Sequence, residues 1–163
     1  MNQRNNQGVL GLPIYFLIAF IVTAVILAIF IFSAQILLQD AQIRELQTKT
    51  GVIVNEAENM FEHADEGTLI SLHIEFPSSL RFLVFGSLPK NSTDIPTNLT
   101  LNENTSNNYY FVMQDGRIST GHSNARFSNR EMNNAVLFYP GVYDLTLELK
   151  RHDGRTYVTM YEQ

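Results

Sequence analysis

One uninterrupted apolar segment, from Leu12 to Ala34, constrains this chain more than any other feature. Its 23 residues, LPIYFLIAFIVTAVILAIFIFSA, include no charged side chain. As a helix rising about 1.5 Å per residue, the segment is long enough to cross a hydrocarbon core of about 30 Å. A soluble core helix rarely keeps every face apolar over that length. The segment therefore predicts a transmembrane helix over residues 12–34.

A cleavable secretory signal is the alternative to a permanent anchor. The apolar region of such a signal is normally about 7 to 15 residues long and ends in small residues at the cleavage site. Here the run is longer, and Ser33-Ala34-Gln35 matches such a site poorly. The sequence favours an anchor that stays in the mature protein, in contact with membrane lipid.

The charges on the two sides of the span predict its orientation. Residues 1–11 carry Arg4 and no acidic residue, whereas the remainder carries 10 of the 11 basic residues and all 16 acidic ones, a net charge of −6. Basic residues beside the first span favour the cytoplasmic side of a membrane. We expect a short cytoplasmic segment 1–11 and an extracytoplasmic domain. The acidic balance also argues against a nucleic-acid partner.

Beyond the span, the helical pattern continues and becomes amphipathic over residues 35–64. Apolar or small residues recur at heptad spacings of seven, three and four. They are Ile36, Ile43, Leu46, Thr50, Ile53, Ala57, Met60 and Ala64. Asp65-Glu66-Gly67 is expected to end this helical spine, because glycine readily adopts the left-handed conformation that closes helices.

The width of this stripe suggests two different partners. A narrow stripe suits another helix, and a broad one suits a sheet. We interpret Ile43, Leu46, Thr50 and Ile53 as a helix–helix seam. After Ile53 the stripe widens, which predicts packing on the chain's own sheet.

From residue 67 to residue 163 the apolar pattern changes to a period of two, which predicts a β domain. Asp115-Gly116, Pro140-Gly141 and Asp153-Gly154 predict turns that each link a pair of strands, while 121–134 is expected to be irregular. The expected strands are 69–76, 80–85, 109–113, 117–120, 135–139, 142–149 and 156–161. The predicted fold class is α+β: a long N-terminal helix packed on a mostly antiparallel sheet or sandwich. No cysteine is present, so packing alone must stabilise it.

A polar loop from Gly86 to Asn108 contains three N-x-[ST] sequons, at Asn91, Asn98 and Asn104. A single sequon is common by chance, but three in one loop on the side expected to be extracytoplasmic favour glycosylation. The alternative is that Asn, Ser and Thr simply abound in polar loops.

The sequence gives little support for catalysis. No nucleophile elbow, glycine-rich phosphate loop or H-E-x-x-H motif occurs. His73 and Glu75 share a strand face but form a poor metal site by themselves. An acidic group near the end of the helix is best explained as a solvated flank; its members are Glu56, Glu58, Glu62, Asp65 and Glu66. We therefore predict no enzyme activity, cofactor or metal.

The whole layout resembles the type IV pilin superfamily, and within it archaeal pilin-like and archaellin-like proteins. The resemblance lies in the polar amino end with Arg4 and Gly8, the apolar span, the continuous amphipathic helix and the cysteine-free β domain. It implies a surface subunit that assembles with other pilin-like subunits through its apolar helix. It also implies peptidase cleavage after Gly8 or Gly11.

The chain departs from the family pattern at the implied cleavage site. No Lys or Arg directly precedes either glycine, and the fifth positions after them are Pro13 and Phe16 rather than glutamate. A second hypothesis therefore stays open: a single-pass, membrane-anchored extracytoplasmic binding domain that does not polymerise. Processing of the amino terminus distinguishes the two hypotheses.

Overall fold

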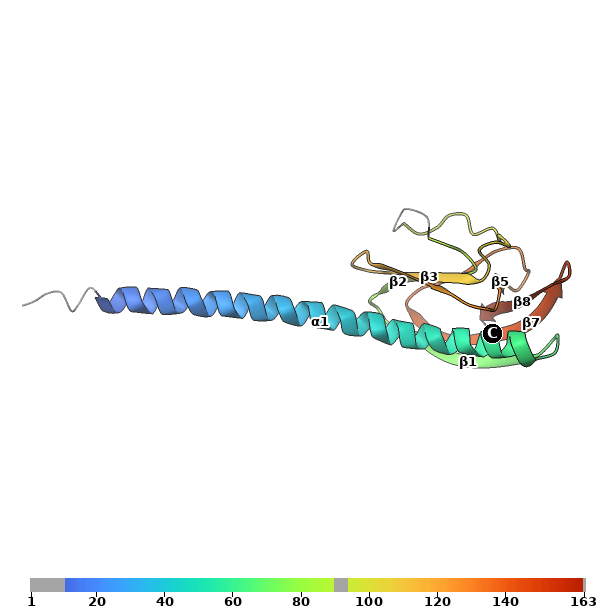
Figure 1. Ribbon diagram of the computed structural model, residues 1–163, viewed down its shortest axis with the longest axis horizontal. Helices are drawn as coiled ribbons and strands as arrows, with labels where there is room; N and C mark the ends of the chain where they lie inside the picture. The colour runs from blue at the N-terminus through green and yellow to red at the C-terminus, as the bar shows by residue number, and fades with distance from the viewer. Residues whose placement is uncertain (1–10, 90–93, 163) are drawn as a thin grey trace, which may run out of the picture. The chain divides into compact units, whose positions relative to one another are not determined.

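The computed structural model describes residues 11–89 and 94–162, and the structural statements below concern those residues (Figure 1). They form one long helix, α1 (Gly11–His63), followed by eight strands in two four-stranded sheets. The α+β fold class with a long N-terminal helix is thus as the sequence predicts. The predicted cytoplasmic segment lies outside the described residues except for Gly11, the first residue of α1.

The two sheets are mostly antiparallel. Sheet A has the order β1 (Leu69–Phe76), β7 (Gly141–His152), β8 (Arg155–Glu162) and β5 (Phe127–Asn129). Sheet B has the order β4 (Ile118–His122), β3 (Asn108–Met113), β2 (Leu80–Phe85) and β6 (Val136–Phe138). Neighbouring strands are antiparallel except β5 and β8, which run parallel.

The chain divides into two compact units, residues 1–41 and 42–163. The second unit contains both sheets and the last part of α1. From Gln42 onward, the helical spine predicted over residues 35–64 belongs to the same unit as the β domain. We describe each unit by itself.

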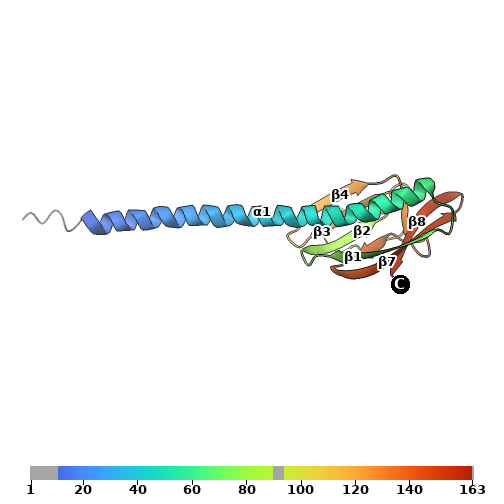
Figure 2. The same ribbon diagram turned by 90° about the horizontal axis from the view of Figure 1, so that it is seen from below.

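In the second unit, α1 and both sheets contribute to one hydrophobic core. The helix supplies Leu46, Ile53, Val54, Ala57 and Met60, all buried. Sheet A and sheet B each turn one apolar face toward these residues. This part of α1 runs between β4, an edge strand of sheet B, and β1, an edge strand of sheet A (Figure 2). The helix therefore forms a wall of the domain core.

Sheet B is apolar on both faces, as the near-continuous apolar run of β2 predicts for a central strand. Its inner face joins the main core, and its outer face carries a second cluster around Phe82, Val84 and Tyr110. Leu99, from the long loop between β2 and β3, packs against that second cluster. The loop is held there by backbone hydrogen bonds, including Ala135 N–H to the Leu99 carbonyl at 2.7 Å.

Three predicted chain reversals are confirmed. Gly67, at φ +87°, follows the helix, and its N–H donates to the Leu149 carbonyl at 2.8 Å. Asp115-Gly116 joins β3 to β4, and hydrogen bonds from Arg117 lower the pKa of Asp115 below its ordinary value. Asp153-Gly154, both with positive φ, joins β7 to β8.

Two predictions about strands are wrong. Residues 121–134 are not wholly irregular: β4 extends to His122, and Phe127 begins β5, where its ring packs 5.1 Å from that of Phe85. A strand of three residues, such as β5, is too short to show an alternation of apolar and polar residues in the sequence. The strands around Pro140-Gly141 do not form a hairpin either, because β6 lies in sheet B and β7 in sheet A. A local turn signal does not specify which sheet the next strand enters.

Tyr109 and Gly121 form a tight cross-strand pair between β3 and β4. They lie directly opposite each other, and a Cβ atom added to Gly121 would overlap the Tyr109 ring. The ring also packs against Phe85, with centroids 5.6 Å apart. The absence of a side chain at Gly121 therefore sets the position of Tyr109.

Replacing Gly121 with Ala should lower the free energy of unfolding of the second unit by about 1 to 3 kcal/mol, because the Tyr109 ring must leave its place. Gly51→Ala is the matched control: nothing lies within 4 Å of its added Cβ, and Gly51 is in a helix. In that variant the free energy of unfolding should rise by up to about 1 kcal/mol. Denaturant unfolding followed by tyrosine near-UV circular dichroism measures both. Equal effects would contradict the packing described.

Candidate functional site

The first candidate site is the apolar surface of α1 in the first unit. Every residue from 13 to 33 is exposed, and 18 large apolar side chains between Ile14 and Leu38 are exposed. The most apolar stretch of α1 has no buried residue, unlike a core helix of a soluble protein. By length and composition α1 is therefore a candidate membrane span.

Two aliphatic hydroxyls in this apolar stretch, those of Thr23 and Ser33, are hydrogen-bonded within the helix. Thr23 Oγ1 donates to the Ala19 carbonyl at 2.8 Å, and Ser33 Oγ donates to the Ile29 carbonyl at 2.9 Å. A hydroxyl that is hydrogen-bonded to its own helix can be placed in hydrocarbon at little free-energy cost, because it does not need water as a partner. Pro13 lies in the first turn of α1, where a missing N–H breaks no helical hydrogen bond. The surface suits lipid or other apolar helices.

The predicted helix–helix seam requires correction. Leu46 and Ile53 have no exposed surface and belong to the core of the chain's own domain, and Thr50 is 1% exposed. Ile43 is half-buried and packs against the same core. Heptad spacing is shared by helices that pack on helices and helices that pack on sheets, which is why the sequence pattern misassigned the partner. Leu46, Thr50 and Ile53 are therefore not available to a neighbouring helix.

The sequon at Asn98 is exposed at the surface of the domain. Asn98 and Thr100 are both exposed, and the Asn98 amide oxygen accepts from the Thr100 N–H at 3.0 Å and from its hydroxyl at 2.6 Å. The asparagine and the hydroxyl two residues further along are thus held together at the surface. The sequon at Asn91 lies outside the described residues, as does Gly8.

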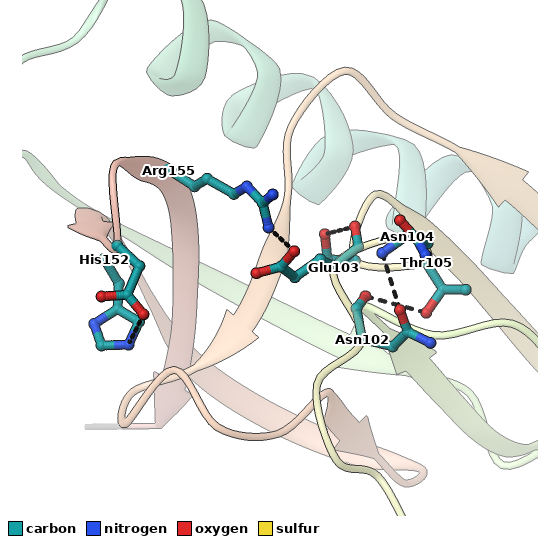
Figure 3. A network of polar contacts seen from close by, with 8 residues as sticks. Asn102, Glu103, Asn104, Thr105, His152 and Arg155 are labelled. Atoms are coloured by element: carbon teal, nitrogen blue, oxygen red, sulfur yellow. Dashed lines mark hydrogen bonds and ion pairs between the residues drawn. The ribbon is translucent and has the colours of Figure 1, made fainter.

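The sequon at Asn104 differs, because its serine is hidden. Ser106 has no exposed surface, and its hydroxyl donates to the Glu103 carbonyl at 3.0 Å. This turn docks on the start of β8 through an ion pair between Glu103 and Arg155 (Figure 3). The Ser106 carbonyl also accepts from the Phe127 N–H at 2.7 Å. Asn104 itself is exposed, but its hydroxyl partner is not.

The acidic residues near the end of α1 tie the helix to the rest of the domain. The Glu58 carboxylate accepts from the Ser123 hydroxyl at 2.8 Å and from the Asn124 N–H at 2.9 Å. The Glu62 carboxylate accepts from the Asn124 side chain at 3.3 Å. The described residues contain no group of three His, Asp or Glu side chains arranged to hold a metal ion.

The His73 side chain on β1 is exposed and pairs with an aspartate of the neighbouring strand. Its Nδ1 atom lies 2.7 Å from Oδ1 of Asp144.

A cleft between α1 and sheet B was not foreseen from the sequence. It has a volume of about 230 Å³ and is lined by Gln47, Thr50, Tyr109, Phe111, Ser119 and Thr120. Burial, and to a lesser extent the Glu58 carboxylate, raise the pKa of Tyr109. The residues come from α1 and from the consecutive strands β3 and β4, which are far from α1 in the sequence, so no local motif could have indicated the cleft.

Comparison with protein-family models, with characterised proteins and with solved structures finds no match to this chain.

The two described sequons should differ in use if modification acts on the folded domain. We expect Asn98→Gln to increase gel mobility in the native host and Asn104→Gln to leave it unchanged, because only the Thr100 hydroxyl is accessible. Thr100→Val, which keeps the side-chain shape but destroys the sequon, is the matched control and should act like Asn98→Gln. Glycopeptide mass spectrometry showing a glycan on Asn104 and none on Asn98 would contradict this ranking.

Proposed function

We propose that this protein is a pilin-like, membrane-anchored surface subunit that assembles through the apolar part of α1. The observation that carries the proposal is that one uninterrupted helix supplies both the exposed apolar surface from Ile14 to Leu38 and a wall of the domain core. In the membrane, lipid covers that apolar surface. After assembly, the same surface is covered by the apolar helices of other subunits.

The continuity of the helix supports assembly over simple anchoring. An anchored domain needs only a flexible linker after the membrane. Here α1 continues to His63, and residues 35–50 contain no proline. The buried positions Leu46, Thr50 and Ile53 are used within the chain itself. The surface left for contacts between subunits is therefore the apolar stretch before Gln39, a narrower region than the heptad pattern predicts.

The proposed topology has the amino end in the cytoplasm and the β domain outside. Arg4 precedes the span, while the domain is acidic and carries sequons. The domain contains no cysteine, so its stability does not depend on the redox state of its compartment.

The alternative function is an anchored, non-polymerising binding domain. Two observations favour it. Neither Gly8 nor Gly11 is preceded by a basic residue. The domain also has a cleft lined by residues of α1, β3 and β4. Under this alternative the amino terminus stays intact and α1 contacts lipid alone.

Assembly is tested with the protein from cells that produce it natively. We expect a mature mass that lacks the residues up to Gly8 or Gly11, and recovery of the protein in the sheared surface fraction. A double variant with Ala24→Leu and Ala28→Leu should remain in the membrane, but its amount in the sheared surface fraction should fall several-fold. Small side chains allow helices to approach closely, whereas added leucines keep the segment apolar.

The matched control exchanges apolar residues of equal size, Ile26→Leu with Leu27→Ile, and should assemble as the unmodified protein does. If the unmodified protein retains Met1 by mass and never appears in the sheared fraction, the filament proposal is wrong. The anchored binding domain then takes its place.

A further inference from the structure

β4 is the least protected edge strand of the two sheets, whose edges are β1, β5, β4 and β6. β5 and β6 have three residues each, and residues 99–101 hydrogen-bond to the residues just before β6. β1 carries the charged Glu75 and lies beside α1 (Figure 2). β4 has five residues without proline, Asp, Glu, Lys or Arg, and an unbroken register with β3. Because proteins usually protect an edge with such devices, β4 is the edge at which another strand can add.

Three residues of β4 direct their backbone polar groups away from β3. The Arg117 carbonyl, just before β4, accepts from the Met113 N–H at 2.9 Å. Hydrogen-bonded pairs alternate with non-bonded pairs along an antiparallel ladder, so Ile118, Thr120 and His122 point their N–H and C=O groups outward. In the described part of the chain, no other element hydrogen-bonds to the backbone of these three residues. Their side chains are exposed as well.

We propose that β4 pairs with β4 of a second copy of this chain, antiparallel and with a two-fold axis at Thr120. In this register Ile118 lies opposite His122 of the second copy, and Thr120 lies opposite itself. Each outward N–H and C=O group of β4 then meets one from the other copy. The pairing brings no like charges together, and it covers the side chain of Ile118, which is 42% exposed. The strand is therefore complementary to itself.

The pair requires two copies that face each other. Gln47 of α1 lines the cleft together with Ser119, near the start of β4. Glu58 accepts a hydrogen bond from Ser123, just beyond the end of β4. From Gln42 onward, α1 therefore runs in the same direction as β4, and in an antiparallel pair the two helices run in opposite directions. The second copy thus approaches from the opposite side, as a copy anchored in a facing membrane would. This contact does not depend on the proposed assembly through apolar helices.

The register is tested by disulfide trapping of the full-length protein in detergent. The chain has no cysteine, so an introduced cysteine meets no other thiol in its own chain. We expect Thr120→Cys to form a linked dimer, because directly opposite residues of a hydrogen-bonded pair lie about 5.5 Å apart at Cα, within the span of a disulfide. Ile118→Cys is the matched control. It should form far less dimer, because its two copies lie about 13 Å apart in this register.

A mixture of Ile118→Cys and His122→Cys should behave differently from either variant alone. These two positions lie opposite each other in the proposed pair, so a mixed disulfide dimer should form in higher yield than the dimer of either variant with itself. Equal dimer formation by Thr120→Cys and Ile118→Cys, or no dimer of Thr120→Cys, would overturn the proposal.

Thr120→Pro separates pairing from folding. The Thr120 N–H points away from β3, so proline removes no hydrogen bond within the domain, and edge strands tolerate proline at such positions. Added to Ile118→Cys and to His122→Cys, it should lower the yield of mixed dimer about tenfold and leave the near-UV circular dichroism unchanged. An unchanged yield in the folded variant would show that the contact does not use β4, and the proposal would be wrong.

The facing arrangement is tested with phosphatidylcholine vesicles. The Ile118→Cys and His122→Cys proteins are reconstituted into separate vesicle populations, which are then mixed. We expect the mixed dimer to form between vesicles, and Thr120→Pro in both proteins to suppress it. If the mixed dimer forms only when both variants share one vesicle, the two copies lie side by side and the proposed facing pair is wrong.

Discussion

The burial of one face of α1 between the two sheets is the interaction on which the domain depends. Leu46, Ile53, Ala57 and Met60 are 0 to 2% exposed, and they contact core residues from both sheets. Neither sheet closes on the other along the side where β1 and β4 form the edges, and α1 runs along that side (Figure 2). In a chain without disulfides, the helix is thus part of the core and cannot be regarded as a linker leading to it.

This arrangement gives the two parts of α1 different chemical tasks. From residue 13 to residue 33 every side chain is exposed, and the stretch is apolar on all sides. From Leu46 onward only one face is apolar, and it is covered by the protein itself. The long continuous apolar surface that still needs a partner therefore lies in the first unit, which supports the proposal that subunits meet there. Among the described residues, the buried hydroxyls without a hydrogen-bond partner, such as Thr50 Oγ1, lie in the second unit.

Much of the fold could be predicted because its signals are local. The strand Leu69–Phe76 follows from the alternation of apolar and polar residues along it. The turn at Asp115-Gly116 follows from the positive φ that glycine readily adopts. The seam at Ile43, Leu46, Thr50 and Ile53 was misassigned because periodicity shows that a face is buried, and not what buries it. The cleft was missed for a related reason: Thr50, Tyr109 and Ser119 are brought together only by the packing of a helix against an edge strand.

The most direct test of this account compares two leucines of α1, one from each unit. Leu46 has no exposed surface and lies in the domain core, whereas Leu38 is 65% exposed. Leu46→Ala should lower the free energy of unfolding of the β domain by about 3 kcal/mol, as expected for a cavity left by a buried leucine. Leu38→Ala should leave that free energy unchanged within about 0.5 kcal/mol. Equal effects of the two substitutions, or no effect of Leu46→Ala, would contradict the claim that α1 is a wall of the domain.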